Sequence, residues 1–469
     1  MVAVLCAVVG GIVLGVTFRP DPNGEEFDLS YHIKVVDAKN SVLEVRVKSS
    51  HMKARNLYLT TASTDAQDSH LPARIRLREA RNAAGTSASV ERGENHWKIR
   101  AKGGGVELRY EIWLKAGLAG GEFAQQTLSH IDEHGARLVG SDLFVFPVFG
   151  APKNIRVSYE LPDSWSLINP FQTGANTAVY PDVRSLYHSA VGLGEYRILE
   201  RTVRDCRLRL AIRGKYRFLD QDLLDTVSQL AAVQMDIFGG ALRKEYVFLV
   251  NPHPLSGDPE TLRYFGLHYD GSMILLIDSN TDRNRLQKEP AQLCAHEFYH
   301  NWCGELIGQH RYDMNWFIEG VTEFYAYQTR LEAKIMSFAE YARVLNERYH
   351  TEFESSPLRG KMSLADAGKE VLVDGETTRF MYSCGLFVAS ALDAEIDELS
   401  QQKYSLDDLM FRLAQKASKD PKFVLTRQTL ETTLLELTGF DFHDWLQSYV
   451  YSTQTPRLPS YITREMAMR

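Results

Sequence analysis

The stretch His296-Glu297-Phe298-Tyr299-His300 decides how this sequence folds and what it can bind. Pro290 and the apolar spacing after it predict a helix over residues 290–306, because proline suits the first position of a helix. Histidines four positions apart lie on one face of such a helix, so both imidazoles can reach one tetrahedral metal ion. Glu297 stands beside them, where it can act on the water that the metal activates. The alternative is a pair of hydrogen-bonded core histidines, and a third ligand would distinguish the two.

A third ligand follows on the next predicted helix, residues 316–332. Glu319 lies nineteen positions after His300 and can point at the same metal. Two histidines and one glutamate leave a fourth position for water, which is the pattern of catalytic rather than structural zinc. Glu323 lies one turn after Glu319 on the same face, so it can accept the other ring N–H of His296 and fix its tautomer. The alternative for Glu323 is a solvated surface glutamate.

Composition limits the class of protein. The chain has 469 residues, of which 44% are hydrophobic, and a net charge of −7. This length suggests about two to four domains, and the apolar content excludes a disordered chain. The acidic balance argues against nucleic-acid binding, which usually needs a basic domain. Five widely spaced cysteines form no disulfide framework or Cys-x-x-Cys metal site, so we interpret them, Cys303 included, as buried core thiols.

The hydrophobic pattern predicts an α+β protein of several domains. Short alternating strands separated by turn residues predict an N-terminal β-sandwich or saddle-like domain, and helical spacing begins near Phe218. Glycines 103–105, between the strand-like runs 97–101 and 106–114, predict a hairpin. The predicted domains are a β domain over 25–216, a mixed α/β catalytic lobe over 217–335 and a helical domain over 336–469.

The amino terminus is apolar. Residues 2–18 carry no charged side chain, and Arg19 and the Pro/Gly-rich stretch 20–24 end the run. Seventeen helical residues span about 25 Å, slightly less than a ~30 Å hydrocarbon core. We therefore expect residues 1–24 to be a signal peptide or a membrane anchor, and the protein to be exported, either periplasmic or otherwise extracytoplasmic, or membrane-anchored. The alternatives are a buried first strand or helix and a wrongly assigned start.

These motifs resemble those of the gluzincin metallopeptidases. Residues 296–302 look most like the glycyl aminopeptidase-like family, related to aminopeptidase N, which favours His-Glu-Phe-x-His-x-Trp. Residues 319–325 are similar to that family's Glu-Gly-x-Thr-x-Tyr-Tyr. The resemblance covers most of residues 27–460 and is sharp between 290 and 395. It implies a thermolysin-like catalytic domain behind a β domain, Zn²⁺ as the cofactor, and a peptide or protein as the substrate.

The resemblance also implies a catalytic tyrosine. Such families carry Tyr-x-Lys-Gly on a later helix, and Tyr382-Ser383-Cys384-Gly385 falls there with Cys384 in place of the lysine. Tyr382 would donate a hydrogen bond to the oxyanion, the alternative being a core or rim tyrosine. The gap between His300 and Glu319 is more like that of aminopeptidase N enzymes. Relatives often carry a C-terminal PDZ domain, and we expect none here, because the predicted helical domain reaches to Arg469.

One strand departs from the family pattern. Relatives place Gly-x-x-Glu before the zinc helix, and its acid holds the free amine of the substrate. The matching stretch here is 265–269, with His268 in place of the acid. An imidazole cannot pair with an ammonium group as a carboxylate does, and Asp270 is a candidate replacement. We still predict that Gly266, Leu267 and His268 bind substrate, because an extended peptide can pair with the main chain of this strand.

Three functions remain open at this point. The first is a zinc aminopeptidase in which His296, His300 and Glu319 hold the metal, Glu297 moves the proton and Tyr382 stabilises the oxyanion. The second is a zinc peptidase without a strict preference for amino termini, which the missing acid favours. The third is a catalytically silent binding protein of the cell envelope. Metal analysis and the digestion of a peptide library would separate them.

Overall fold

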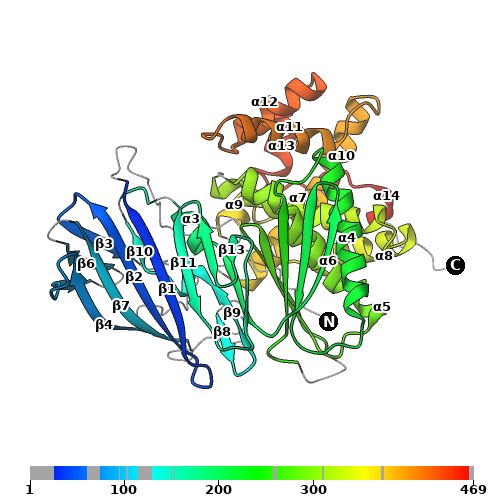
Figure 1. Cartoon of the computed structure of the whole chain (residues 1–469). Coiled ribbons are helices and arrows are strands. Elements are labelled where there is room, and N and C mark those ends of the chain that lie inside the picture. Colours follow the sequence, from blue (N-terminus) through cyan, green and yellow to red (C-terminus); the bar gives the residue numbers. More distant parts are fainter. Residues whose placement is uncertain are drawn as a thin grey trace.

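The structure, a computed structural model, describes residues 26–463 apart from 61–73, 94–95, 102–103, 115–128, 149, 153, 257–260, 309–310 and 371–373. The predicted export segment, residues 2–18, lies outside this described part. Within it, no helix is long and apolar enough to cross a membrane. As Figure 1 shows, a β domain, a mixed α/β lobe and a group of helices follow one another along the chain.

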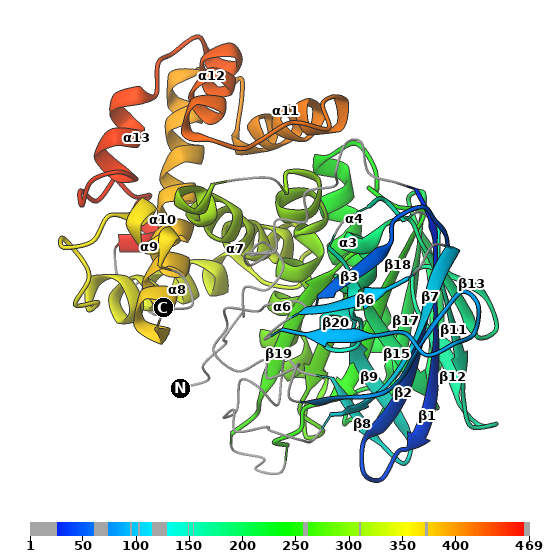
Figure 2. The ribbon, with the colours of Figure 1, turned by 90° about the vertical axis from the view of Figure 1, so that its left-hand side faces the viewer.

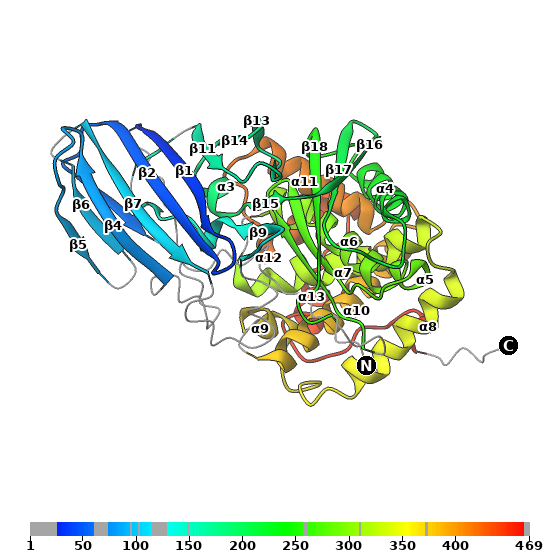
Figure 3. The same ribbon diagram turned by 60° about the horizontal axis from the view of Figure 1, so that its bottom comes forward.

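The β domain contains two sheets (Figures 1 and 3). The side chains between them form one apolar core. In the larger sheet Leu29, Tyr31 and Ile33 alternate with more exposed residues and face this core, as the period of a half-buried strand requires. The larger sheet has the order β13 (Gln172–Gly174), β14 (Thr177–Tyr180), β11 (Ile155–Glu160), β1 (Asp28–Asp37), β2 (Val42–Met52), β7 (Gly104–Trp113) and β4 (Ile75–Asn82). The smaller sheet has the order β10 (Phe146–Pro147), β3 (Asn56–Thr60), β6 (His96–Arg100) and β5 (Val90–Arg92).

The predicted hairpin around glycines 103–105 is wrong. Strand β6 pairs with β3 and β5 in the smaller sheet, whereas β7 pairs with β2 and β4 in the larger one. Gly104 and Gly105 both have positive φ, and a Cβ at Gly105 would lie 2.2 Å from the Ser49 carbonyl oxygen. Gly104 and Gly105 thus begin strand β7, where the positive φ and the close approach of β2 both favour glycine.

The mixed α/β lobe is built on a five-stranded sheet. Its order is β16 (Arg197–Val203), β17 (Cys206–Ile212), β18 (Glu245–Pro252), β20 (Ser272–Ile277) and β19 (Tyr264–Tyr269). Strands β17, β18 and β20 are parallel, and β19 is an antiparallel edge strand. Because β16 and β17 pair into this sheet, the sheet extends across the domain boundary expected between residues 216 and 217.

Each face of this sheet is covered by a different layer. One face packs against a small sheet of the order β12 (Ser166–Ile168), β15 (Ala190–Gly194), β9 (Gly135–Val139) and β8 (His130–Asp132), which also contributes residues to the core of the β domain. The other face packs against helices α4 (Asp220–Ile237) and α6 (Glu289–Tyr299). Helix α6, which carries His296 and ends directly before His300, therefore lies on the sheet next to the edge strand β19.

Helices dominate the described residues from 315 onward, as Figure 2 shows from the side. Helix α7 packs between α6 and α10, and α7 carries Glu319 while α10 carries Tyr382. The helices of this region are α7 (Asn315–Glu332), α8 (Phe338–Arg348), α9 (Leu364–Lys369), α10 (Gly375–Leu399), α11 (Leu406–Lys419), α12 (Arg427–Thr438), α13 (His443–Tyr449) and α14 (Ser460–Thr463).

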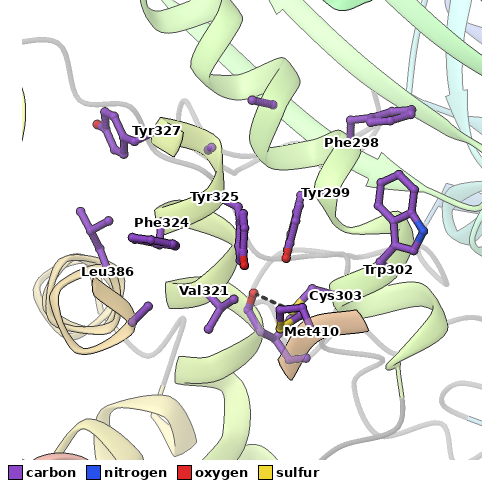
Figure 4. Packing of buried hydrophobic residues seen from close by; sticks show 14 of the residues in the cluster. Phe298, Tyr299, Trp302, Cys303, Val321, Phe324, Tyr325, Tyr327, Leu386 and Met410 are labelled. Carbon is purple, nitrogen blue, oxygen red and sulfur yellow. Dashed lines mark hydrogen bonds between the residues drawn. The ribbon is translucent and has the colours of Figure 1, made fainter. Parts of the chain in front are cut away.

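Aromatic packing fixes α6 against α7 (Figure 4). The rings of Tyr299 and Tyr325 stack with centroids 4.5 Å apart and an interplanar angle of 13°. Cys303 lies in the same apolar cluster, with its Sγ 3.6 Å from the Ile318 carbonyl oxygen. This rigid contact sets the position of one metal-binding helix relative to the other.

Candidate metal centre

The structure brings the three predicted metal ligands together. One ligand atom from each of His296, His300 and Glu319 lies within 4.8 Å of the others, and all three side chains are buried. Oε2 of Glu319 is 3.4 Å from Nε2 of His296 and 3.6 Å from Nε2 of His300. His296 lies on α6, His300 is the residue directly after α6, and Glu319 lies on the adjacent α7. Two imidazole nitrogens and a carboxylate oxygen facing one point match the donor set of a zinc site with an open position.

Each imidazole is oriented by a hydrogen bond at Nδ1, the ring nitrogen that faces away from the metal position. Nδ1 of His296 lies 2.9 Å from Oε2 of Glu323, and Nδ1 of His300 lies 2.8 Å from the Cys303 carbonyl oxygen. Both partners are acceptors, so each Nδ1 carries a proton, and Nε2 is the nitrogen that each ring would offer to a metal. Glu323 is only 4% exposed, which excludes the surface glutamate that the sequence left open.

The main chain after His300 is bent to make the second of these bonds. The continuous helix predicted over 290–306 is wrong, because α6 ends at Tyr299 and a π-type turn, η2 (Asn301–Leu306), follows with non-helical dihedrals at Cys303 and Gly304. This break turns the Cys303 carbonyl toward His300. Gly304 has φ of 143°, and a Cβ there would lie 3.1 Å from Nδ1 of His300. Glycine is therefore favoured at position 304, where the backbone lies close to the His300 ring.

The charges around the site suit a cation. Burial alone would lower the pKa of His296, but hydrogen bonds to Glu319 and Glu323 raise it to about 10. Burial would likewise raise the pKa of Glu323, but Arg348 and His296 lower it to about 2. The pKa of Glu319 is held well below its usual range, against the effect of burial, by His300 and His296. Two ionised carboxylates thus stabilise positive charge among buried imidazoles, and the residues present fit Zn²⁺.

Glu297 lies beside the ligands without belonging to them. Its carboxylate accepts a hydrogen bond from the backbone N–H of His268, and burial is the main reason why its pKa is raised. A raised pKa suits a group that must take up a proton and then release it. Gly266 makes room for this side chain, since a Cβ there would lie 3.0 Å from Cγ of Glu297.

Tyr382 reaches the same point from α10. Its hydroxyl donates a 2.8 Å hydrogen bond to Oε2 of Glu319, and its ring centroid is 5.9 Å from that of His296. A close helix crossing sets this distance, because a Cβ on Gly320 would lie 2.5 Å from the backbone of Gly385. Glycines at both positions let α7 and α10 approach closely enough for the hydroxyl to meet the metal ligands.

The predicted substrate-binding residues lie on the edge strand β19. Gly266 and His268 face α6, and the His268 ring centroid is 6.0 Å from that of His300. The Leu267 side chain is on the opposite face of the sheet, in the cluster with Val139 and Val247. Leu267 can therefore contribute only its main chain to a substrate site, because alternate residues of a strand face opposite sides.

Two charged residues near His268 were missed by the sequence analysis. Oε2 of Glu305 lies 3.3 Å from Nε2 of His268, and Arg243 forms an ion pair with the same carboxylate. The proposed replacement Asp270 is instead bound to His188, with Oδ1 2.7 Å from Nδ1. Glu305 lay inside a predicted helix, and no signal in the sequence relates it to a strand 37 residues earlier.

Comparison with known proteins agrees with this geometry. Residues 262–396 match the peptidase family M1 domain. The matched residues include all three metal ligands, Glu297, Tyr382 and strand β19, so the gluzincin assignment made from the sequence is confirmed. The sequence matches none of the curated proteins significantly.

Solved structures of M1 proteins share this fold. An aminopeptidase N family protein from Idiomarina loihiensis is 16% identical, with a TM-score of 0.79 over 92% of this chain and 78% of that chain. An M1 zinc metallopeptidase mutant from Deinococcus radiodurans, bound to a Tyr-Ser-Ala substrate, is 14% identical, with a TM-score of 0.61 over 93% of this chain and 95% of that chain. These matches confirm the α+β multidomain fold class predicted from the sequence.

Proposed function

We propose that this protein is a zinc-dependent peptidase that releases residues from the free amino terminus of peptides. The observation that carries this proposal is the convergence of His296, His300 and Glu319 within 4.8 Å, with Glu297 and Tyr382 beside them. The M1 domain and the M1 structures bound to a peptide or to L-arginine support it.

Each residue of the site has a defined task in peptide hydrolysis. Zinc, when bound, supplies a Lewis acid that acidifies water and polarises a carbonyl group. The Glu297 carboxylate accepts a proton from the attacking water and donates it to the nitrogen of the leaving amine. The Tyr382 hydroxyl donates a hydrogen bond to the carbonyl oxygen of the scissile bond as negative charge develops there. Strand β19, at the edge of the sheet, pairs with an extended peptide through its main chain.

We assign the free amine of the substrate to Glu305. This carboxylate lies against His268, the residue that stands where relatives have their acid. Burial is the main reason why the pKa of His268 is lowered, so the imidazole is neutral and does not repel an ammonium group. Arg243, the present partner of Glu305, is 31% exposed and can turn toward solvent when an ammonium group takes its place. Asp270 is unsuited to this task because His188 occupies it.

We expect Glu305→Gln to raise the KM for a peptide with a free amino terminus about 10- to 100-fold, because hydrogen bonds to charged groups are worth about 1.5–3 kcal/mol. The same change should leave the hydrolysis of the N-acetylated peptide unchanged. Initial rates on the two peptides measure both effects. Glu111→Gln is a matched control, since Glu111 also pairs with an arginine, Arg78, but lies in the β domain.

The same assay separates the three functions left open by the sequence. Equal hydrolysis of free and N-acetylated peptides by the unmodified protein would favour a peptidase without preference for amino termini and would overturn the role of Glu305. Stoichiometric zinc without hydrolysis of either peptide, or of a peptide library, would favour a silent binding protein instead.

We further propose that residues 2–18 direct export of the protein or anchor it to a membrane, with residues 25–469 outside the cytoplasm. The support is the uncharged apolar run that ends in a Pro/Gly-rich stretch. We expect cell fractionation to find the protein in the envelope or outside the cell, and full-length soluble protein in the cytoplasm would contradict the proposal.

A further inference from the structure

A buried arginine from outside the metal site reaches the second carboxylate of α7. Arg348 is the last residue of α8, and its side chain is only 15% exposed. Its Nη1 forms an ion pair with Oε1 of Glu323 and lies 3.2 Å from the Tyr327 hydroxyl. Its Nε donates a 2.9 Å hydrogen bond to Glu352. The guanidinium is therefore held from several sides, which fixes the direction of the group that it offers to Glu323.

The two oxygens of Glu323 face different partners. Oε1 faces Arg348, and Oε2 faces Nδ1 of His296 at 2.9 Å. A planar carboxylate bound at both oxygens cannot rotate without breaking one of these bonds. Arg348 thus fixes the carboxylate that in turn fixes the plane of the His296 ring. The three residues form a continuous connection from α8 to a metal ligand.

The connection also supplies a counter-charge. Glu323 is nearly inaccessible to water, and a buried carboxylate is costly without a positive partner. Among the residues that the structure describes, Arg348 is the cation paired with Glu323, apart from His296 itself. Nothing in the zinc motif requires an arginine at this place, and Arg348 comes from a helix that contributes no metal ligand.

We propose that Arg348 is a positioning residue for the metal: by holding Glu323, it keeps Nε2 of His296 aimed at the zinc position and so raises zinc affinity. Loss of such outer partners typically costs about 10- to 100-fold in metal affinity. This inference rests on the proposed zinc site. The alternative is that Arg348 only joins α8 to α7, in which case its loss would lower stability and leave zinc affinity unchanged.

The test measures zinc affinity of the full-length protein by competition with a chelator of known affinity. We expect Arg348→Met to weaken zinc binding about 10- to 100-fold. Arg343→Met is the matched control, because Arg343 lies on the same helix but is exposed and pairs with Glu347, and it should bind zinc as the unmodified protein does. Thermal unfolding of the metal-free proteins reports any loss of stability separately. Lower stability with unchanged zinc affinity would overturn the proposal.

If Arg348→Met does not fold, the test uses Arg348→Lys, measured with and without the change Glu323→Gln. Arg348→Lys keeps the charge but cannot hold the carboxylate in the same orientation. We expect it to weaken zinc binding several-fold in the unmodified protein and to have no further effect when Glu323 is already Gln. Equal weakening in both backgrounds, or none in either, would overturn the proposal. Absence of zinc from the unmodified protein would instead contradict the proposed function itself.

Discussion

Replacing Glu297 by Gln is expected to leave one zinc per chain and to lower kcat by about 10²–10⁴-fold. Glu297 lies beside the ligands, but its carboxylate accepts the backbone N–H of His268 and is not one of the three grouped donors. Glutamine has nearly the same shape and keeps an acceptor for that N–H, so the fold and the metal should be retained. The amide cannot take up the proton of the attacking water. Metal content and peptide hydrolysis, measured on the same preparation, check both parts of this result.

Variants of the ligands are the controls for this assignment. His300→Ala and Glu319→Ala each remove one of three donors and should lose most of the zinc, with activity lost as a consequence. Equal loss of zinc in all three variants would contradict the separate roles of Glu297 and the ligands. Circular dichroism of each metal-free protein shows whether lost zinc reflects the missing donor or a fold that has not formed.

The metal ligands could be predicted because their arrangement depends mostly on local structure. Helical spacing alone places His296 and His300 on one face, and Glu319 and Glu323 on one face of the next helix. The prediction needed only one further assumption, that the helix with His296 and the helix with Glu319 lie side by side. The structure shows why they are, since Tyr299 of α6 stacks on Tyr325 of α7. Both rings were visible in the sequence, but their contact was not.

Contacts between distant segments could not be predicted in this way. Glu305 meets His268, and Arg348 meets Glu323, across packing that no local pattern records. The break at Gly304 was also missed, because a glycine inside an otherwise helical pattern is tolerated and gives no direction to the chain. In each case the missing information was tertiary.

The hairpin error has the same origin. The runs on either side of glycines 103–105 do form strands, β6 and β7. Two strands that follow one another closely in the sequence pair with each other only if both belong to the same sheet. Here β6 pairs with β3 and β7 pairs with β2, and both partners lie far away in the sequence.

We expect Tyr382→Phe to keep zinc and substrate affinity but to lower kcat by about 10²–10³-fold. The Tyr382 hydroxyl is 2.8 Å from Oε2 of Glu319, so it lies next to the proposed metal position. The carbonyl oxygen of the scissile bond must approach that position to be polarised. That oxygen carries full negative charge only in the transition state, and a donor aimed at it therefore affects kcat more than KM. Steady-state kinetics and metal content of the variant measure these quantities.

Two other results would each give Tyr382 a different role. If its hydroxyl serves only to orient Glu319, the variant should lose zinc affinity, and activity should return when excess zinc is supplied. If it is only a core hydroxyl, unfolding free energy should fall by about 1 kcal/mol with kcat unchanged. Tyr325→Phe is the control for the case of a core hydroxyl, because the buried Tyr325 hydroxyl donates a 2.6 Å hydrogen bond to Asp407, away from the metal ligands.

Cys384 replaces the lysine found in relatives two residues after the tyrosine, and it lies buried on α10. The position of the Tyr382 hydroxyl therefore depends on the close crossing at Gly320 and Gly385 rather than on that lysine, and a kcat effect of the expected size would show that this crossing suffices.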